Sequence, residues 1–479
     1  MTTILRHIIF SGLAGLMTLS ASAITPEEVN KAVSLAREAP RNKVFNRKAG
    51  DALKEAGRFK EAITYYLKGD NAANLGAAES YFYLYEFDKA GEYLDKYLEK
   101  RTKAEAAKDK NFISGDGGEP VDWTDNLRSR IDLGRAMLDR VEKIEIIDSI
   151  NVPSDNFFKF FKLAKSAGRI SDETALDKVV SAETLRELGV MSLWSPVFIS
   201  ESGEDLIWYG SSESGDSKMF ESTRLADGSW DKPTPLFDYA DMFGDKEGSW
   251  VAYPFLMSDG VTLYFAADGD NSLGELDIFI SRRDSDGFLQ PSNVGMPYNS
   301  PYNDYLYAID EENKVGWWAT DRNQLQDSVT IYTFIPQELR VNYPTDTPEL
   351  TDYARVLSIA MTQNGETDYA AIKERIKDSS TESEATEKSN FIFGLPGGKV
   401  ITSMSQLSNQ RAVAAMRQYL AEKDAYDKMA ENLAKMRQAY ANRDKSVGNR
   451  ILSTEKAMEE KRAELLRLKN RVVTLNQQR

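Results

Sequence analysis

A strand pattern that recurs three times constrains this 479-residue sequence more than any other feature. Short alternating apolar runs occupy 206–211, 263–268 and 316–321, and each is followed by a second strand-like run, at 218–222, 276–281 and 330–334. The first two runs begin 57 residues apart. Strand pairs punctuated by Gly and Asp at such spacing are typical of repeated antiparallel sheets, so we expect one sheet for each pair.

Repeated sheets of this kind predict a β-propeller, which we place at residues 144–403. The region opens with a strand-like run at 144–152. A closed propeller needs about four or more sheets, so further strands are expected from 144–195 and from 337–403, where 391–393 and 399–401 are weak candidates. A helical insertion is predicted at 348–361, and the Ser-, Thr- and Glu-rich segment near 378–390 predicts a disordered loop.

Residues 24–143 carry a helical pattern that also repeats. Phe59 and Phe87 are 28 residues apart, and each follows a helix with small residues and opens a helix with aromatic ones. Thr25 followed by Pro26 and Glu28 predicts the start of the first helix. A third helix pair is expected at 95–143. Stacked helix pairs form an α-solenoid whose concave face binds peptide segments, and the alternative is an array that packs only on its neighbouring domain.

Two stretches resemble known families. Gly57-Arg58-Phe59-Lys60-Glu61-Ala62-Ile63, with Tyr66, resembles the tetratricopeptide repeat, although the second unit follows after 28 residues rather than 34. The stretches 259–268, 274–283 and 299–304 resemble the TolB-like, WD-repeat-like propeller of Gram-negative envelope proteins.

The order of these modules resembles a Gram-negative cell-envelope family related to the peptidoglycan-anchoring subunit of the type IX secretion machinery. In that family an OmpA-like domain follows the propeller. Here residues 404–479 instead predict two amphipathic helices, a coiled-coil hairpin broken near 446–449. This departure argues against peptidoglycan anchoring and leaves membership of a secretion machine open.

The N-terminal residues 1–23 have the order of a signal peptide: Arg6, an apolar run, then Ala21-Ser22-Ala23. We therefore expect a periplasmic protein, associated with the outer membrane at its periphery. The chain has no cysteine, so it is not expected to be a lipoprotein. Its C-terminal 76 residues carry a net charge of +7 and the remainder carries −22, a distribution that suits either an interaction tail or a solvated helical face.

Composition excludes several kinds of chemistry. The only histidine is His7, inside the predicted signal peptide, so Ser-His-Asp, Cys-His and ordinary zinc sites are excluded. The net charge of −15 argues against a nucleic-acid partner. Carboxylate chemistry remains, but the resemblance to the TolB-like propeller implies that Asp268, Asp277 and Asp304 fall at turn positions of that family, where Asp supports an Asx-turn. We expect no catalytic residues, no metal, no cofactor and no enzyme activity.

Six residues are candidates for binding. Asp268 and Asp270 offer oxygen ligands in a propeller loop, without the spacing of an EF-hand. Asp321 and Trp317 belong to the third strand pair, and Tyr66 and Tyr85 to the helical repeats. The predicted function is a scaffold or adaptor that binds envelope or outer-membrane proteins. The alternatives are a glycan-binding or glycan-processing propeller and a self-assembling structural protein.

Overall fold

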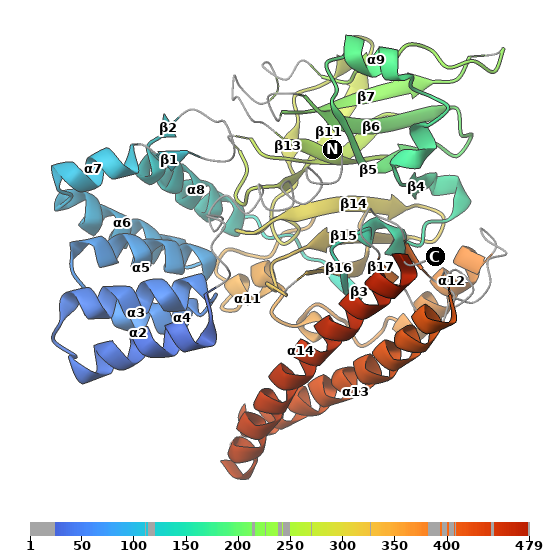
Figure 1. The fold of residues 1–479 in the computed structure, drawn as a ribbon. Coiled ribbons are helices and arrows are strands. Elements are labelled where there is room, and N and C mark those ends of the chain that lie inside the picture. The colour runs from blue at the N-terminus through green and yellow to red at the C-terminus, as the bar shows by residue number, and fades with distance from the viewer. Residues whose placement is uncertain are drawn as a thin grey trace. The chain divides into compact units, whose positions relative to one another are not determined.

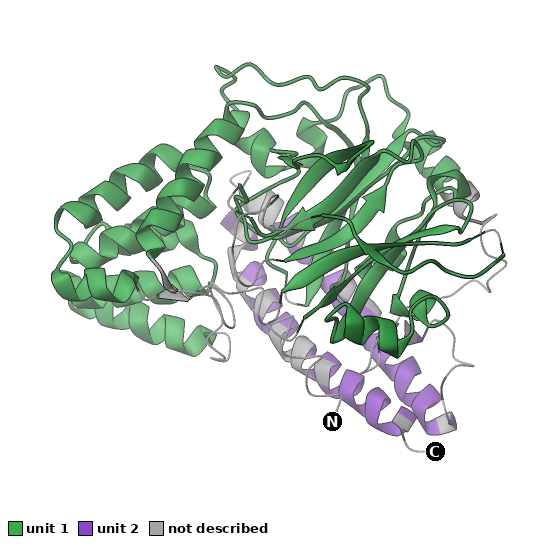
Figure 2. Ribbon diagram, turned by 90° about the horizontal axis from the view of Figure 1, so that it is seen from above, with its two compact units in different colours: residues 1–384 green, residues 385–479 purple. Residues whose placement is uncertain are grey.

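The structure, a computed structural model of the chain, divides into two compact units, residues 1–384 and 385–479 (Figure 2). It is a mixed α and β protein, with an N-terminal helical region followed by antiparallel sheets. The predicted signal peptide lies outside the described residues, as does most of the predicted loop near 378–390. The described residues are 24–110, 112–113, 120–212, 216–225, 227–237, 242, 250–269, 271–325, 327–381, 393–394, 400–401, 407, 409–441 and 445–477.

The helical region begins where the sequence predicts. Thr25 caps the first helix, and its hydroxyl and the Glu28 carboxylate form the expected capping box. The helices lie side by side (Figure 1). They are α2 (Pro26–Glu38), α3 (Lys43–Glu55), α4 (Phe59–Tyr66), α5 (Asn71–Tyr83), α6 (Phe87–Glu99), α7 (Lys103–Asp109) and α8 (Trp123–Leu138), with the short pair β1 (Phe112–Ile113) and β2 (Pro120–Val121) between the last two.

Small residues allow close helix packing in this region. A Cβ added to Gly50 or Gly76 would lie 2.6 or 2.4 Å from the aromatic ring of Tyr66. Phe59 and Phe87, the repeated aromatic residues, are both buried. The Phe positions that the repeat pattern identified therefore belong to the core that joins successive helices.

Three antiparallel sheets of four or five strands follow within the described residues. The first is β4 (Arg169–Ser171), β5 (Ser192–Ile199), β6 (Asp205–Ser211), β7 (Ser217–Thr223) and β8 (Thr234–Pro235). The second is β9 (Val251–Leu256), β10 (Thr262–Ala267), β11 (Asp277–Asp284) and β12 (Gly287–Phe288), with β13 (Ser292–Asn293) on β11. The third is β14 (Asp304–Asp310), β15 (Val315–Thr320), β16 (Ser328–Ile335) and β3 (Glu145–Pro153).

The predicted strand pairs are confirmed as hairpins of these sheets. The pairs β6–β7, β10–β11 and β15–β16 are each antiparallel neighbours. The strand predicted at 144–152 is β3, and it pairs with β16, the last strand of the third sheet; Ile150 lies opposite Ile331. The first and the last long strands of the sheet region, β3 and β16, are thus neighbours in one sheet.

The weak strand candidates 391–393 and 399–401 coincide with a short pair, Phe393–Gly394 and Val400–Ile401, which lies in the second unit. The described residues of the first unit therefore form three sheets of four or five strands, fewer than the four or more that were expected. After β16 the chain forms α11 (Leu350–Arg355), a 3-10 turn η5 (Ile359–Met361) and α12 (Tyr369–Thr381). The predicted helix 348–361 is shorter because Val356 adopts a left-handed conformation that ends it. Ile372 and Ile376 of α12 instead pack into the core between the sheets.

The connection between β3 and β5 consists mainly of short helical turns. These are η2 (Phe157–Phe160), η3 (Lys165–Ala167), η4 (Glu173–Leu176) and α9 (Ala182–Glu187). Phe157 and Phe158 of η2 are buried in the same core as β9, β14 and β15, and the partly buried Phe160 packs against it.

The second unit contains α13 (Gln410–Ala441), the turn η7 (Lys445–Val447), α14 (Gly448–Gln477) and the strand pair β17 (Phe393–Gly394) and β18 (Val400–Ile401). Two long helices are found where the hairpin was predicted. The predicted boundary at 403/404 differs from the unit boundary at 384/385, because Phe393 and Ile401 are buried with Ala412 and Val472 of the helices. These strands therefore do not extend the sheets of the first unit.

Candidate binding site

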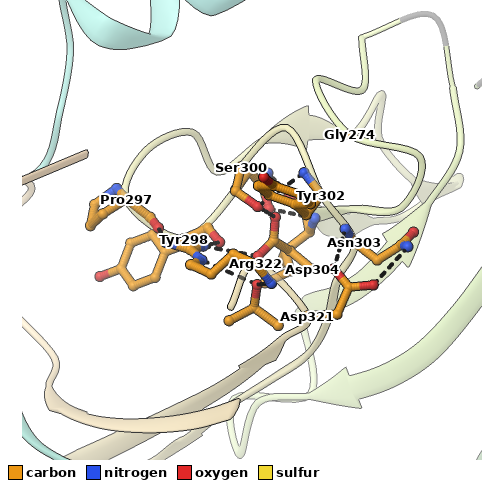
Figure 3. A network of polar contacts seen from close by, with 12 residues as sticks. Gly274, Pro297, Tyr298, Ser300, Tyr302, Asn303, Asp304, Asp321 and Arg322 are labelled. Atoms are coloured by element: carbon orange, nitrogen blue, oxygen red, sulfur yellow. Dashed lines mark hydrogen bonds and ion pairs between the residues drawn. The ribbon is translucent and has the colours of Figure 1, made fainter. Parts of the chain in front are cut away.

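The loop that leads into β14 is fixed to its neighbours by buried amides. Asn299 is fully buried, and its side chain accepts from the Ile278 N–H at 2.7 Å and donates to the Ile278 carbonyl at 2.8 Å. Gly274 lets the adjacent loop approach, since an added Cβ would lie 1.9 Å from the Tyr302 carbonyl oxygen (Figure 3). These contacts hold the loop rigidly above the ends of β11 and β14.

Arg322 and Asp304 form a buried ion pair under this loop. Arg322 Nη2 lies 2.9 Å from Asp304 Oδ1, and both side chains are almost fully buried (Figure 3). Arg322 also donates to the carbonyls of Pro297 and Tyr298, at 2.8 and 2.6 Å. Ser300 Oγ donates to Asp304 Oδ2 at 2.7 Å. A buried charge is tolerated only when paired and hydrogen-bonded, and this guanidinium meets both conditions.

Asp321 is engaged in a second set of hydrogen bonds. Its carboxylate accepts from the Asn303 N–H at 2.8 Å, from Asn303 Nδ2 at 3.0 Å and from the Tyr305 hydroxyl at 3.0 Å. Burial raises the pKa of Asp321 to about 6, although these hydrogen bonds favour the charged form. Asp277, which is fully buried, has a pKa raised by burial to about 7.

Two tyrosines reach this place from the end of α5. Tyr83 is the last residue of the helix, and its ring centroid lies 5.1 Å from that of Tyr302. Tyr85 follows in a left-handed conformation, with φ of 62°, and is buried. A bulky residue with positive φ is a conformational outlier, and such outliers gather at functional sites.

Arg355 approaches the same tyrosines from the end of α11. Its guanidinium carbon lies 5.9 Å from the ring centroid of Tyr85. It is half-buried, and no carboxylate of the described residues lies within ion-pair distance of it. The next residue, Val356, has φ of 53°, which is unusual for a β-branched side chain. Two strained residues, Tyr85 and Val356, thus flank one arginine.

These side chains line a cavity of about 130 Å³. It reaches the surface, because Asn323 is exposed and Leu357 is 59% exposed. The lining residues are Tyr83, Tyr85, Tyr302, Arg322, Asn323, Arg355, Val356 and Leu357. They include two cations and no carboxylate, so the cavity suits an anionic group that accepts hydrogen bonds.

The structure brings two of the six predicted binding residues to this place. Tyr85 lines the cavity, and Asp321 lies next to Arg322 in sequence, with its carboxylate bound to Asn303 and Tyr305. Tyr66 and Trp317 are buried in the helical and sheet cores and do not line the cavity.

The two loop aspartates have different outcomes. Asp268 is half-buried at the end of β10, and its N–H donates to the Trp250 carbonyl at 2.9 Å. Asp270 lies outside the described residues, so the prediction that Asp268 and Asp270 bind a ligand together stays a prediction. No group of three or more acidic side chains converges as a metal site anywhere in the described chain.

Sequence reasoning missed the two arginines and the tyrosines Tyr83 and Tyr302. Tyr302 lies in the 299–304 stretch that carried the propeller resemblance, so its segment was singled out without a role. Arg322 directly follows the predicted Asp321. No pattern marked Arg355, because its position beside Tyr85 depends on the tertiary fold.

Comparisons with family models, with curated proteins and with solved structures return no match for this chain. Within the described residues, no helix has both the length and the apolar character needed to cross a bilayer. The function must therefore be argued from the geometry.

Proposed function

We propose that this chain is a non-enzymatic scaffold or adaptor of the cell envelope. In this proposal the N-terminal helices form a tetratricopeptide-like solenoid, the three sheets are blades of a TolB-like β-propeller, and α13 and α14 form a coiled-coil hairpin. The exported, periplasmic location rests on the sequence of residues 1–23, and the partners are envelope or outer-membrane proteins.

The filled centre of the sheet region is the observation that carries this proposal. Phe157 of η2 lies with its ring centroid 5.6 Å from Tyr253 and 5.5 Å from Tyr305, and those two tyrosines lie 5.5 Å apart. Phe161 adds a contact with Trp317 at 6.5 Å. We call Phe157, Phe161, Tyr253, Tyr305 and Trp317 the aromatic hub. In the proposed propeller these rings would fill the central channel that a propeller enzyme keeps open, and this supports a structural role.

A shared core between helices and sheets supports the same proposal. Leu273 and Met296 of the sheet loops are fully buried in one cluster with residues of the helical region. Arg130 of α8 donates to the Leu273 carbonyl at 2.7 Å, and the Glu142 N–H donates to the Met296 carbonyl at 3.0 Å. Such a continuous core fixes the helices against the sheets and suits a body that presents surfaces in a constant geometry.

The glycan-processing alternative gains no support from these contacts. Trp208, Trp317 and Trp318 are each at most 3% exposed, so they are not placed to stack on sugars. Asp304 is paired with Arg322, and Asp321 is held by Asn303 and Tyr305. Paired catalytic carboxylates would instead face each other across a space for water or substrate.

Photo-crosslinking in intact envelopes tests the scaffold proposal. A photoreactive amino acid replaces Val44 or Leu67, which are 42% and 53% exposed on the helical repeats, and in a control replaces Met191, which is 67% exposed in the sheet region. We expect a discrete adduct with the same envelope protein from Val44 or Leu67 and none from Met191. Equal adducts from all three positions, or none, would contradict the proposal.

A further inference from the structure

We propose that the cavity between α5, α11 and the loops before β14 and after β15 binds a single carboxylate of a partner polypeptide. Its donor is the Arg355 guanidinium, and the lining tyrosines form the adjoining wall. This inference rests on the proposed scaffold function only for the source of the carboxylate, since the cavity itself is described by its own geometry.

The charges of the cavity wall indicate the charge of the ligand. Arg322 is neutralised by Asp304 behind it, and its guanidinium is occupied by that carboxylate, two carbonyls and Thr320 Oγ1. Arg355 has no ion pair within the described chain, and its guanidinium lies over the face of Tyr85. One uncompensated cation in a half-buried wall favours a monoanion over a dianionic phosphate.

The donor geometry favours a carboxylate in particular. An arginine presents two parallel N–H groups that match the two oxygens of a carboxylate. The rings of Tyr83 and Tyr302 lie 5.1 Å apart and form an adjoining wall, which suits the short apolar stem that carries the group.

The size of the cavity sets a limit on what enters. A cavity of about 150 Å³ accommodates a benzene molecule, so 130 Å³ is room for one acidic side chain or one chain terminus and not for a folded element. Leu357, 59% exposed at the mouth, offers an apolar contact to the residues that flank the bound group.

The backbone adopts two unusual conformations at this cavity. Tyr85 and Val356 both hold positive φ angles, of 62° and 53°, and both line the same cavity. Left-handed conformations are unfavourable for residues with a Cβ. Tyr85 lies beyond the end of α5 and Val356 directly follows Arg355 at the end of α11, so both unusual turns lie at the cavity wall.

Isothermal titration calorimetry with the full mature chain tests the proposal using three probes. The first is a glutamate-containing tripeptide, acetylated and amidated so that its side chain is the only acid. The second is an acetylated Gly-Gly-Ala with a free C-terminus, and the third is inorganic phosphate. Binding of either peptide supports the proposal, and the stronger one identifies the source as a side chain or a terminus. Binding of neither peptide, or tighter binding of phosphate than of both, overturns it.

Three variants connect the signal to the cavity. Arg355→Gln is expected to weaken peptide binding at least about tenfold, because it removes a charge-assisted pair. Leu357→Glu, a change at an exposed position, is expected to weaken it similarly by repulsion. Arg37→Gln is the matched control, since Arg37 is an exposed arginine in the last turn of α2. Unchanged binding in both cavity variants, or an equal loss in the control, overturns the proposal.

The result is separable from the scaffold proposal. If crosslinks from Val44 or Leu67 find a partner but no peptide binds in the cavity, the carboxylate site falls and the scaffold stands. If peptides bind and Arg355→Gln abolishes the signal while no crosslink forms, the cavity stands and the helical repeats lose their assigned role.

Discussion

The aromatic hub and the cavity lined by Tyr85 and Arg355 both contain several aromatic rings, but the rings contact different groups. In the hub, Phe157, Tyr253 and Tyr305 face one another, and the Tyr305 hydroxyl is bound to Asp321. In the cavity, Tyr85 faces the guanidinium of Arg355, which has no ion pair among the described residues. The comparison teaches that aromatic content alone does not locate a site. An aromatic cluster becomes a candidate site where a neighbouring polar side chain can still form hydrogen bonds or an ion pair with a ligand.

The largest loss of stability is expected when the buried ion pair between Arg322 and Asp304 is broken. Arg322→Met leaves Asp304 buried without its partner, which costs about 3 to 5 kcal/mol of unfolding free energy. Urea unfolding monitored by circular dichroism measures this. The double variant Arg322→Met with Asp304→Leu removes both charges and is expected to recover much of the loss. A single variant within about 1 kcal/mol of wild type would mean that the pair is not buried as described.

The hub is expected to respond next. Phe157→Ala removes a ring that contacts Tyr253 and Tyr305, and it should cost about 3 kcal/mol, at the lower end for such changes because the short η2 turn can settle into the space. Peptide binding by the folded variant should be unchanged. If the folded variant lost peptide binding, the hub and the cavity would not be independent regions.

A pH effect follows from Asp321. Its folded pKa of about 6 lies above the ordinary value near 3.9, so the folded state holds the proton more tightly than the unfolded state. The stability it contributes is full below about pH 4 and is lost as pH rises through about 6, by about 2 to 3 kcal/mol. Asp321→Asn should flatten this part of the stability profile measured by chemical unfolding. An unchanged slope would show that Asp321 is ionised throughout.

The smallest effect on stability is expected at Arg355, the arginine proposed to bind the carboxylate. Arg355→Gln breaks no ion pair, so it should change the unfolding free energy by about 0.5 kcal/mol or less. Thermal unfolding measures this beside Arg37→Gln. A loss comparable to that of Arg322→Met would assign Arg355 a structural role and remove the contrast between the two arginines.

Local patterns allowed much of the secondary structure to be predicted. Three strand pairs, the strand at 144–152 and the capping box at Thr25 and Glu28 are all found, because period-two alternation and capping depend on neighbours in sequence. The end of α11 was misjudged because Val356, a β-branched residue, gives no signal for a left-handed turn. The left-handed backbone conformation of Tyr85 was not predicted either, because a tyrosine gives no sequence signal for a positive φ.

The candidate site depended on contacts that no local pattern contains. Arg355 lies 270 residues after Tyr85 in the chain, and only the fold brings them together. Asp321 was singled out, yet its carboxylate is consumed by Asn303 and Tyr305, whereas its neighbour Arg322 lines the cavity. Trp317 was chosen for its ring, and burial in the hub makes it a core residue.

Hydrogen–deuterium exchange with the glutamate tripeptide tests the contrast between hub and cavity most directly. At saturating peptide, the account predicts slower exchange confined to segments around 83–86, 302–304, 320–323 and 354–358. Exchange in η2, β9 and the rest of the hub should not change. Protection centred on the hub, or no protection in any segment despite bound peptide, would contradict the claim that the cavity is the place where this chain receives a partner.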